Sequence, residues 1–300
     1  MGRRYRRRIA IALTRAKLLG QPLPLQLYDY TPVNGTTTLA LSGNWRNRSG
    51  FFTFVTVGGN LNYKWYTNPR KRHELNLFNL EYNSVIRTTA AFDSITRANP
   101  ALYISMRDQL VPSISYIFTS TSPATDRHPY WVQFLLKEAG NVTSGLYALT
   151  GRSFSETAKH LLRSPFSQFV KATAEGHYTR VFSPRLSLAM RAFAGVVYAY
   201  GNSTQAPYGE QFFVGGANSV RGFAVRTIGP GGYHTQRTKY SYIDQTGDVK
   251  LEANAELRTR LFGQLNGALF LDAGNVWLIR PDANRPESGL TLRNLKRIAV

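Results

Sequence analysis

The chain has 300 residues, of which 43% are hydrophobic, 13% are aromatic and only 18% are charged. Its 37 basic residues outnumber 17 acidic ones, and a net charge of +20 suits an anionic partner, either nucleic acid or an anionic membrane surface. The absence of cysteine excludes disulfides and thiolate metal sites. No apolar run approaches the roughly 18 residues of a spanning helix, which disfavours a helical membrane protein.

The chain begins with a basic segment, MGRRYRRRIAIAL, in which five arginines precede the apolar run Ile9–Leu13. This order imitates a signal peptide. However, polar and basic residues within Thr14–Lys17 interrupt the apolar region, and no small-x-small cleavage site follows. We interpret the segment as a short basic amphipathic stretch or as sequence cut from a longer protein.

Downstream, apolar residues recur with a period of two, which predicts strands with one apolar and one polar face. Many of these segments exceed the five or six residues of an ordinary globular strand. A phase slip at Leu77 and Phe78 predicts a bulge. Helical patterns are limited to the basic N-terminal segment and to a short stretch at Ser155–Leu162. The expected strands cover residues 36–48, 55–65, 74–87, 110–120, 129–138, 142–150, 168–182, 186–200, 249–261 and 264–277.

The alternation is clearest at the end of this series. From Val249 to Leu261 the odd positions are apolar or small, whereas the even positions include Glu256. In the following segment the same phase puts Asp272 on the polar face. Since only Gly263 and its neighbours separate the two segments, a tight hairpin is expected.

Long strands with a charged face are typical of a transmembrane β-barrel, in which the apolar face meets lipid and the polar face lines a wet lumen. We therefore expect an all-β fold, an antiparallel barrel domain at residues 36–300, separate from the basic segment at 1–35. Aromatic residues near strand ends are expected at the membrane interfaces; they are Tyr63, Trp65, Tyr198, Tyr200 and Trp277. A soluble β-sandwich or lipocalin-like barrel is the alternative, with its charged face in solvent.

The connection at residues 201–246 is far longer than ordinary loops. Its glycines and large apolar residues favour a functional segment over a disordered one. Within it, GGANSVRGF presents Arg221 between the glycine pair Gly215 and Gly216 and a third, Gly222. Read locally, this is a flexible turn that carries a solvated cation.

Motifs of catalysis and metal binding are missing from the sequence. The five histidines have no ligand spacing, and there is no nucleophile elbow, Walker loop or dinucleotide fingerprint. We therefore expect no enzyme activity, metal or cofactor.

The segment PYGEQFFVGGANSVRGFAVRTIGPGGY, residues 207–233, resembles the sixth extracellular loop of the BamA/TamA superfamily of outer-membrane assembly proteins, the bacterial surface antigen family. The hallmark is VRGF, from Val220 through Arg221 and Gly222 to Phe223. An aromatic pair and a double glycine precede it, and IGP, ANAELR and LFLDAGNVW follow in the family's order. The resemblance implies that the loop folds into the lumen and that Arg221 pairs with the acidic residues Glu256 and Asp272.

The resemblance further implies a sixteen-strand barrel, of which this chain is a part that stops before the last strands. It implies a location in the bacterial outer membrane, contact with its lipid and lipopolysaccharide, and client outer-membrane or secreted proteins as partners. Periplasmic POTRA domains are expected in the full-length protein. The function it implies is assembly or translocation of outer-membrane proteins; a transporter for one dedicated partner or for lipid is the alternative, and a soluble protein that binds nucleic acid is a remote one.

Overall fold

The computed structural model describes residues 23–30, 35–48, 52–98, 103, 104, 106–123, 125–151, 153, 154, 159–234, 245–280, 282–296 and 298. Most of the basic segment expected at 1–35 lies outside the described residues, as do four residues of the short helix considered at Ser155–Leu162. The chain divides into two compact units. Unit 1 comprises Met1–Ile117, Lys137–Val170 and Ala199–Pro207, and unit 2 comprises Phe118–Leu136, Lys171–Tyr198 and Tyr208–Val300.

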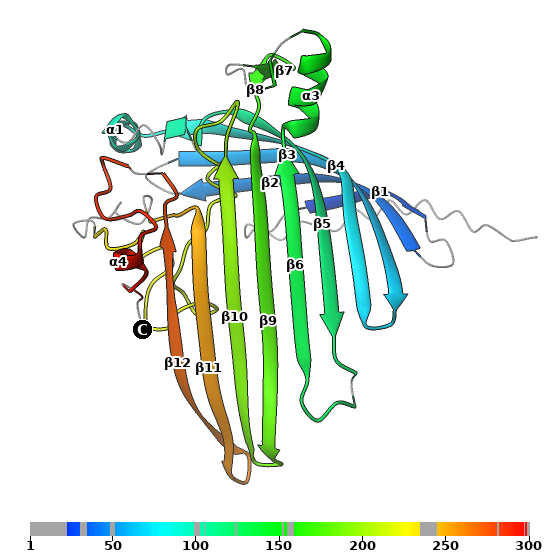
Figure 1. The fold of residues 1–300 in the computed structure, drawn as a ribbon, viewed down its shortest axis with the longest axis vertical. Coiled ribbons are helices and arrows are strands. Elements are labelled where there is room, and N and C mark those ends of the chain that lie inside the picture. The colour runs from blue at the N-terminus through cyan, green and yellow to red at the C-terminus, as the bar shows by residue number, and fades with distance from the viewer. Residues whose placement is uncertain are drawn as a thin grey trace, which may run out of the picture. The chain divides into compact units, whose positions relative to one another are not determined.

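Antiparallel strands dominate the described residues (Figure 1), which confirms the expected all-β fold. Hydrogen bonds order ten strands as β1-β2-β3-β4-β5-β6-β9-β10-β11-β12, and β7 pairs with β8. The strands are β1 (Leu23–Tyr30), β2 (Gly35–Arg48), β3 (Phe52–Asn68), β4 (Lys71–Thr88), β5 (Gln109–Thr121), β6 (Tyr130–Ala139), β7 (His160–Leu161), β8 (Ser164–Pro165), β9 (Phe169–Ser183), β10 (Leu186–Ala199), β11 (Val249–Phe262) and β12 (Leu265–Trp277). The helices are α1 (Ala90–Ala98), α3 (Asn141–Leu149) and α4 (Leu292–Leu295). Within the described ranges, no helix has both the length and the apolar character needed to cross a membrane.

In unit 1, β3 and β4 form a hairpin with the bulge that the phase slip predicts. Leu61 pairs with Phe78, whereas the next residue, Asn62, pairs with Asn76, so the ladder skips Leu77. An extra residue in one strand lets two neighbouring side chains escape the strict alternation of faces. Accordingly, both Leu77 and Phe78 are exposed. The bulge prediction is confirmed.

The strand expected at residues 142–150 is wrong, because this segment forms helix α3. Gly140 takes a left-handed conformation, φ 74°, where an added Cβ would lie 2.3 Å from the carbonyl oxygen of Ser167. The chain turns there directly into a helix. Ser144 then faces inward, and Val142 and Leu146 lie exposed one turn apart. Over so few residues, helical spacing and strand alternation are hard to tell apart.

Two further elements of unit 1 were not expected. Strand β1 lies inside the stretch assigned to the basic segment and pairs with β2. Helix α1 follows β4 and buries Phe92, whose ring lies 5.0 Å from that of Phe52. A helix of nine residues is too short to produce a clear periodic signal. The segment considered as a helix at Ser155–Leu162 instead contains β7 at its described end.

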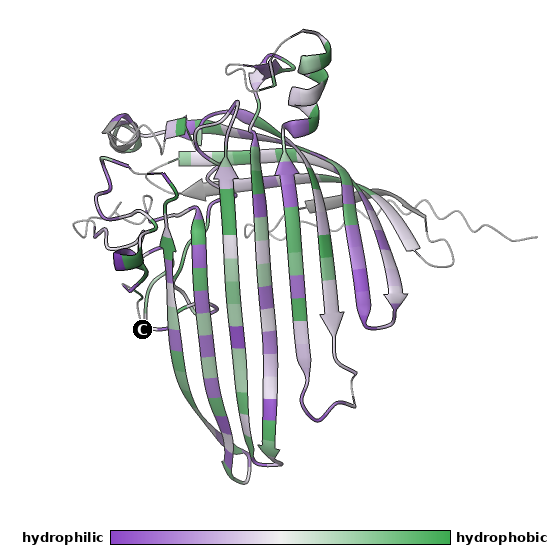
Figure 2. Ribbon diagram, in the orientation of Figure 1, coloured by the Kyte–Doolittle hydropathy of each residue, from purple (hydrophilic) through white to green (hydrophobic). Residues whose placement is uncertain are grey.

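In unit 2 the apolar face of the strands is the exposed one. Figure 2 shows apolar and polar bands alternating along β9, β10 and β11. On β12, Leu269 and Leu271 are 75% and 62% exposed, whereas Asp272, on the opposite face of the same strand, is 5% exposed. A soluble protein would bury the leucines and expose the acid. The pattern is that of a barrel strand that faces lipid with its apolar side.

The core of unit 2 lies where the connection between β10 and β11 covers the polar face of β12. Val214 and Val220, from this connection, are both buried. They meet at Gly274, where an added Cβ would lie 3.1 Å from Val220 and 3.3 Å from Val214. A side chain at this position in β12 would push the connection away from the strands. The polar face is therefore covered by the chain's own loop.

Candidate functional site

Backbone pairing closes the base of the loop between β10 and β11. Phe212 and Gly247 exchange two backbone hydrogen bonds, each 2.9 Å long. Inside the loop, Val214 forms an antiparallel bridge with Ile228. These backbone contacts pair segments from the two ends of the loop. The VRGF segment lies between the paired residues Val214 and Ile228.

Three glycines allow the loop to make its turns. Gly215, Gly216 and Gly222 have φ values of 105°, 100° and 86°, in the left-handed region that other residues rarely adopt. At Gly215 an added Cβ would also lie 2.2 Å from the carbonyl oxygen of Ala224. This position therefore excludes every other residue for two separate reasons.

Arg221 lies on the polar face of the β11–β12 hairpin. Its Nε donates to Asp272 Oδ2 at 2.7 Å and its Nη2 donates to Asp272 Oδ1 at 2.8 Å, a two-pronged contact between guanidinium and carboxylate. Nη1 donates to Glu256 Oε2 at 2.6 Å. The backbone N–H of Arg221 also donates to Asp272, at 3.0 Å. The structure thus brings together the arginine and the two acids that the sequence analysis named.

The strand register explains how one arginine reaches both acids. Asn254 is opposite Asp272, and Glu256 is opposite Phe270, so the four side chains form a square on one face of the hairpin. The Arg221 guanidinium carbon lies 3.8 Å from the centre of the Phe270 ring. Phe270 was not predicted as part of the site, because an aromatic residue departs from the polar pattern of this face; it belongs to the site as a cation–π partner of Arg221.

Asp272 and Glu256 stabilise the charged form of the Arg221 side chain. The side chain of Asp272 is 3% exposed and that of Arg221 is 26% exposed, so the pair is partly shielded from solvent. Hydrogen bonds to Asp272, and next those to Glu256, raise the pKa of the Arg221 guanidinium above its usual range. Arg221 therefore remains a cation at any physiological pH.

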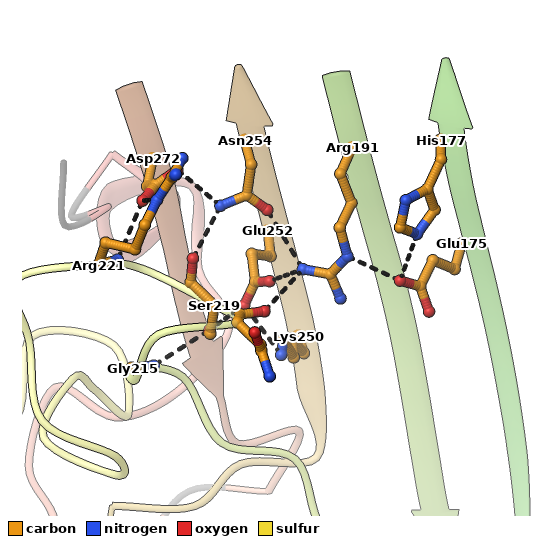
Figure 3. Close-up of polar contacts among 11 residues, drawn as sticks. Glu175, His177, Arg191, Gly215, Ser219, Arg221, Lys250, Glu252, Asn254 and Asp272 are labelled. Carbon is orange, nitrogen blue, oxygen red and sulfur yellow. Dashed lines mark hydrogen bonds and ion pairs between the residues drawn. The ribbon is translucent and has the colours of Figure 1, made fainter. Parts of the chain in front are cut away.

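A second polar cluster, shown in Figure 3, adjoins the first and was missed by the sequence analysis. At its centre is Glu252 on β11, which forms ion pairs with Arg191 on β10 and Lys250 on β11. The loop residue Ser219 donates its hydroxyl to the same carboxylate. The available signal was the alternation itself, because Glu252 shares its strand face with Glu256.

The interfacial aromatic residues are not all where the sequence analysis expects them. Trp277 is fully buried, and its indole N–H donates to the carbonyl oxygen of Asn294 at 3.0 Å. This prediction is corrected: Trp277 ends a strand, but the segment that follows folds over it. Tyr198 is exposed, with the Arg280 guanidinium 5.0 Å from its ring centre, and Tyr200 is partly exposed.

Tyr63 and Trp65 lie in unit 1 and form one side of an aromatic stack. Their rings are 5.3 Å apart, and the Trp65 ring lies 5.0 Å from that of His73 across the β3–β4 hairpin. The ring of Tyr116 lies 6.4 Å from that of Trp65. Such a stack places broad amphipathic surfaces together near the end of a hairpin, which is compatible with a membrane interface.

The exposed apolar strand face and the covered polar face define the class of this protein: it is part of a transmembrane β-barrel with a loop that returns onto its own strands. Residues 139–298, just over half of the chain, match the Omp85 superfamily domain. The chain belongs to the Omp85 superfamily. The resemblance to the BamA/TamA superfamily is thereby confirmed.

One sequence relative and two solved structures show similarity to this chain. The outer membrane protein assembly factor BamA of Neisseria meningitidis serogroup B is 30% identical over 139 residues, which are 45% of this chain and 17% of that protein. The crystal structure of BamA from Haemophilus ducreyi, lacking POTRA domains 1–3, superposes with a TM-score of 0.61 at 12% identity, covering 86% of this chain and 50% of that one. CdiB from Escherichia coli gives a TM-score of 0.46 at 16% identity, covering 85% of this chain and 41% of that one. The chain therefore spans half or less of the length of each of these three proteins.

Proposed function

We propose that this chain is the barrel portion of a non-enzymatic outer-membrane machine that assembles or translocates other outer-membrane proteins. Its loop, locked by Arg221 to Glu256 and Asp272, would hold the lumen in a defined state while clients insert. The contact of Arg221 with acids on two neighbouring strands is the observation that carries the proposal. An ion pair of this kind fixes the loop relative to the barrel wall, and Lys could not reproduce its geometry.

The proposal includes partners that the chain itself does not contain. Client outer-membrane or secreted proteins, the surrounding lipid and lipopolysaccharide, and POTRA domains in the full-length protein would act together with the barrel. The alternative is a related barrel that exports one dedicated partner or moves lipid. The exposed apolar strand face and the family membership count against the soluble, nucleic-acid-binding alternative.

Depletion of the full-length protein from its host is expected to reduce the folded fraction of many unrelated outer-membrane proteins, because an assembly machine serves all of them. The measurement is heat-modifiable migration on gels: folded barrels migrate differently before and after boiling. Re-expression of the unaltered protein serves as the control. Loss of a single secreted protein with normal levels of all others would favour the dedicated exporter, and unchanged levels of every outer-membrane and secreted protein would exclude both functions.

A further inference from the structure

The loop contacts the strands at a second charged site, centred on Glu252 and separate from the Arg221 site. The Glu252 side chain has no exposed surface, and it contacts Arg191, Lys250 and the hydroxyl of Ser219. The Lys250 Nζ lies 2.9 Å from Glu252 Oε2. A carboxylate without solvent is costly unless several donors surround it. One of those donors here comes from the loop.

Ser219 transmits the contact into the loop's own turn. Its hydroxyl oxygen also accepts a hydrogen bond from the backbone N–H of Gly215 at 3.1 Å. Gly215 is the crowded, left-handed glycine where the loop reverses. The hydroxyl thus links Glu252 on the strand to the backbone geometry that presents Arg221.

Arg191 extends the contact to the strands further along. Its Nε donates to Glu175 on β9 at 2.7 Å, which orients the guanidinium. Its Nη1 reaches Glu252 and, at 3.3 Å, the backbone carbonyl oxygen of Asn218 in the loop. The wall on this side therefore presents a donor to the loop backbone and an acceptor to the loop hydroxyl.

Asn254 links the Glu252 site to the Arg221 site through hydrogen bonds. Its Nδ2 donates to the carbonyl oxygen of Ser219 at 2.8 Å and to Asp272 Oδ1 at 2.9 Å. Its Oδ1 accepts from Arg191 at 3.2 Å. Because one amide serves both clusters, loss of either contact disturbs the other, as in any shared polar network.

We propose that Glu252 is a second positioning residue for the loop, which acts through Ser219 and is coupled by Asn254 to the Arg221 site. Release of the loop then requires two charged contacts to break together. This inference rests on the proposed function only for the importance of the docked loop. Its test measures loop opening directly, without any client protein.

The test uses a thiol as a reporter of loop opening, in a full-length protein without other cysteines; these 300 residues contain none. Val220→Cys places the thiol in the loop at a position that is 1% exposed, and Val197→Cys places one at a 0% exposed position in β10. A buried thiol reacts only when its surroundings open. In the folded full-length protein, Glu252→Gln is expected to speed modification of the loop thiol by about tenfold or more, the effect of roughly 1.4 kcal/mol. The β10 thiol should change by less than about twofold if the barrel itself stays closed.

Ser219→Ala should also speed modification of the loop thiol. Its combination with Glu252→Gln should add little, because both substitutions weaken the same contact between Ser219 and Glu252. Glu74→Gln is the matched control, since Glu74 is also an acid between two cations, Lys64 and Arg72, but lies in β4 of unit 1. An unchanged loop rate, or equal acceleration at both reporter thiols, would overturn the proposed role of Glu252. Failure of the assembly function would appear separately, as normal outer-membrane protein levels after depletion.

Discussion

Arg221→Ala is expected to release the loop and to destabilise the folded barrel, with an upper bound of about 3 to 5 kcal/mol, the cost of breaking a buried ion pair. The partial exposure of Arg221 should place the loss below that range. The free energy of unfolding can be measured by urea titration of the full-length protein folded into lipid vesicles. Assembly activity should fall together with this free energy.

The pairing itself is tested by a double-mutant cycle of Arg221→Ala and Glu256→Ala. Since both changes remove the same contact, the double variant should lose clearly less than the sum of the single losses. Additive losses would contradict direct coupling of the two residues. Arg221→Lys should recover only part of the loss, because Lys lacks the planar fork that binds Asp272 through two nitrogens.

Arg258→Ala provides a matched control for the loss of an arginine. Its Nε lies 2.8 Å from Glu256, the same acid that Arg221 binds, but its side chain is 58% exposed and belongs to the strand. Exposed ion pairs contribute about 0 to 1 kcal/mol. A loss for Arg258→Ala as large as that for Arg221→Ala would mean that the charge of Glu256, and not the docked loop, matters.

Gly215→Ala is expected to abolish the docked conformation of the loop. The left-handed backbone alone costs a non-glycine residue about 1 to 2 kcal/mol, and the Cβ would in addition approach the Ala224 carbonyl oxygen to 2.2 Å. Backbone atoms cannot move aside as a flexible side chain can. Heat-modifiable migration and assembly activity of the full-length variant should both fall.

Gly222→Ala separates the two costs. Gly222 also has a left-handed φ, 86°, but no described atom lies within 4 Å of its added Cβ. It should therefore show only the smaller backbone cost. If Gly215→Ala were no more damaging than Gly222→Ala, close packing of the turn on Ala224 would not be needed for docking.

The strands were predictable because a strand with one apolar face and one polar face has strictly alternating apolar and polar residues in its sequence. In β11, apolar or small residues such as Leu251 alternate with charged or polar residues over more than ten positions, so the period is clear. In β12 the alternation is weaker, but Leu269 and Leu271 share one face and Asp272 lies on the other. The bulge at Leu77 was visible for the same reason, as a break in a long alternation. Helix α3 was not predictable in this way, because it has only nine residues. The spacing of Val142 and Leu146 fits both the strand period of two and the helical period of 3.6.

The site was partly predictable. The phase of β11 and β12 placed Glu256 and Asp272 on one face, and the VRGF resemblance supplied Arg221 as their partner. Phe270 was missed because an aromatic residue on a polar face makes sense only beneath a cation. Trp277 was misplaced because strand-end position cannot reveal that Asn294, seventeen residues later, covers it.

Local periodicity therefore specified the fold class, the two faces of each long strand and the side on which the acids lie, because these depend on residues one or two positions apart. The second charged cluster depended on long-range contacts. Ser219, Arg191 and Glu252 come from a loop and two strands, and their meeting follows from the register of β10 with β11 and from the path of the loop across them. No spacing along the chain encodes a contact that requires three distant segments to fold onto one face.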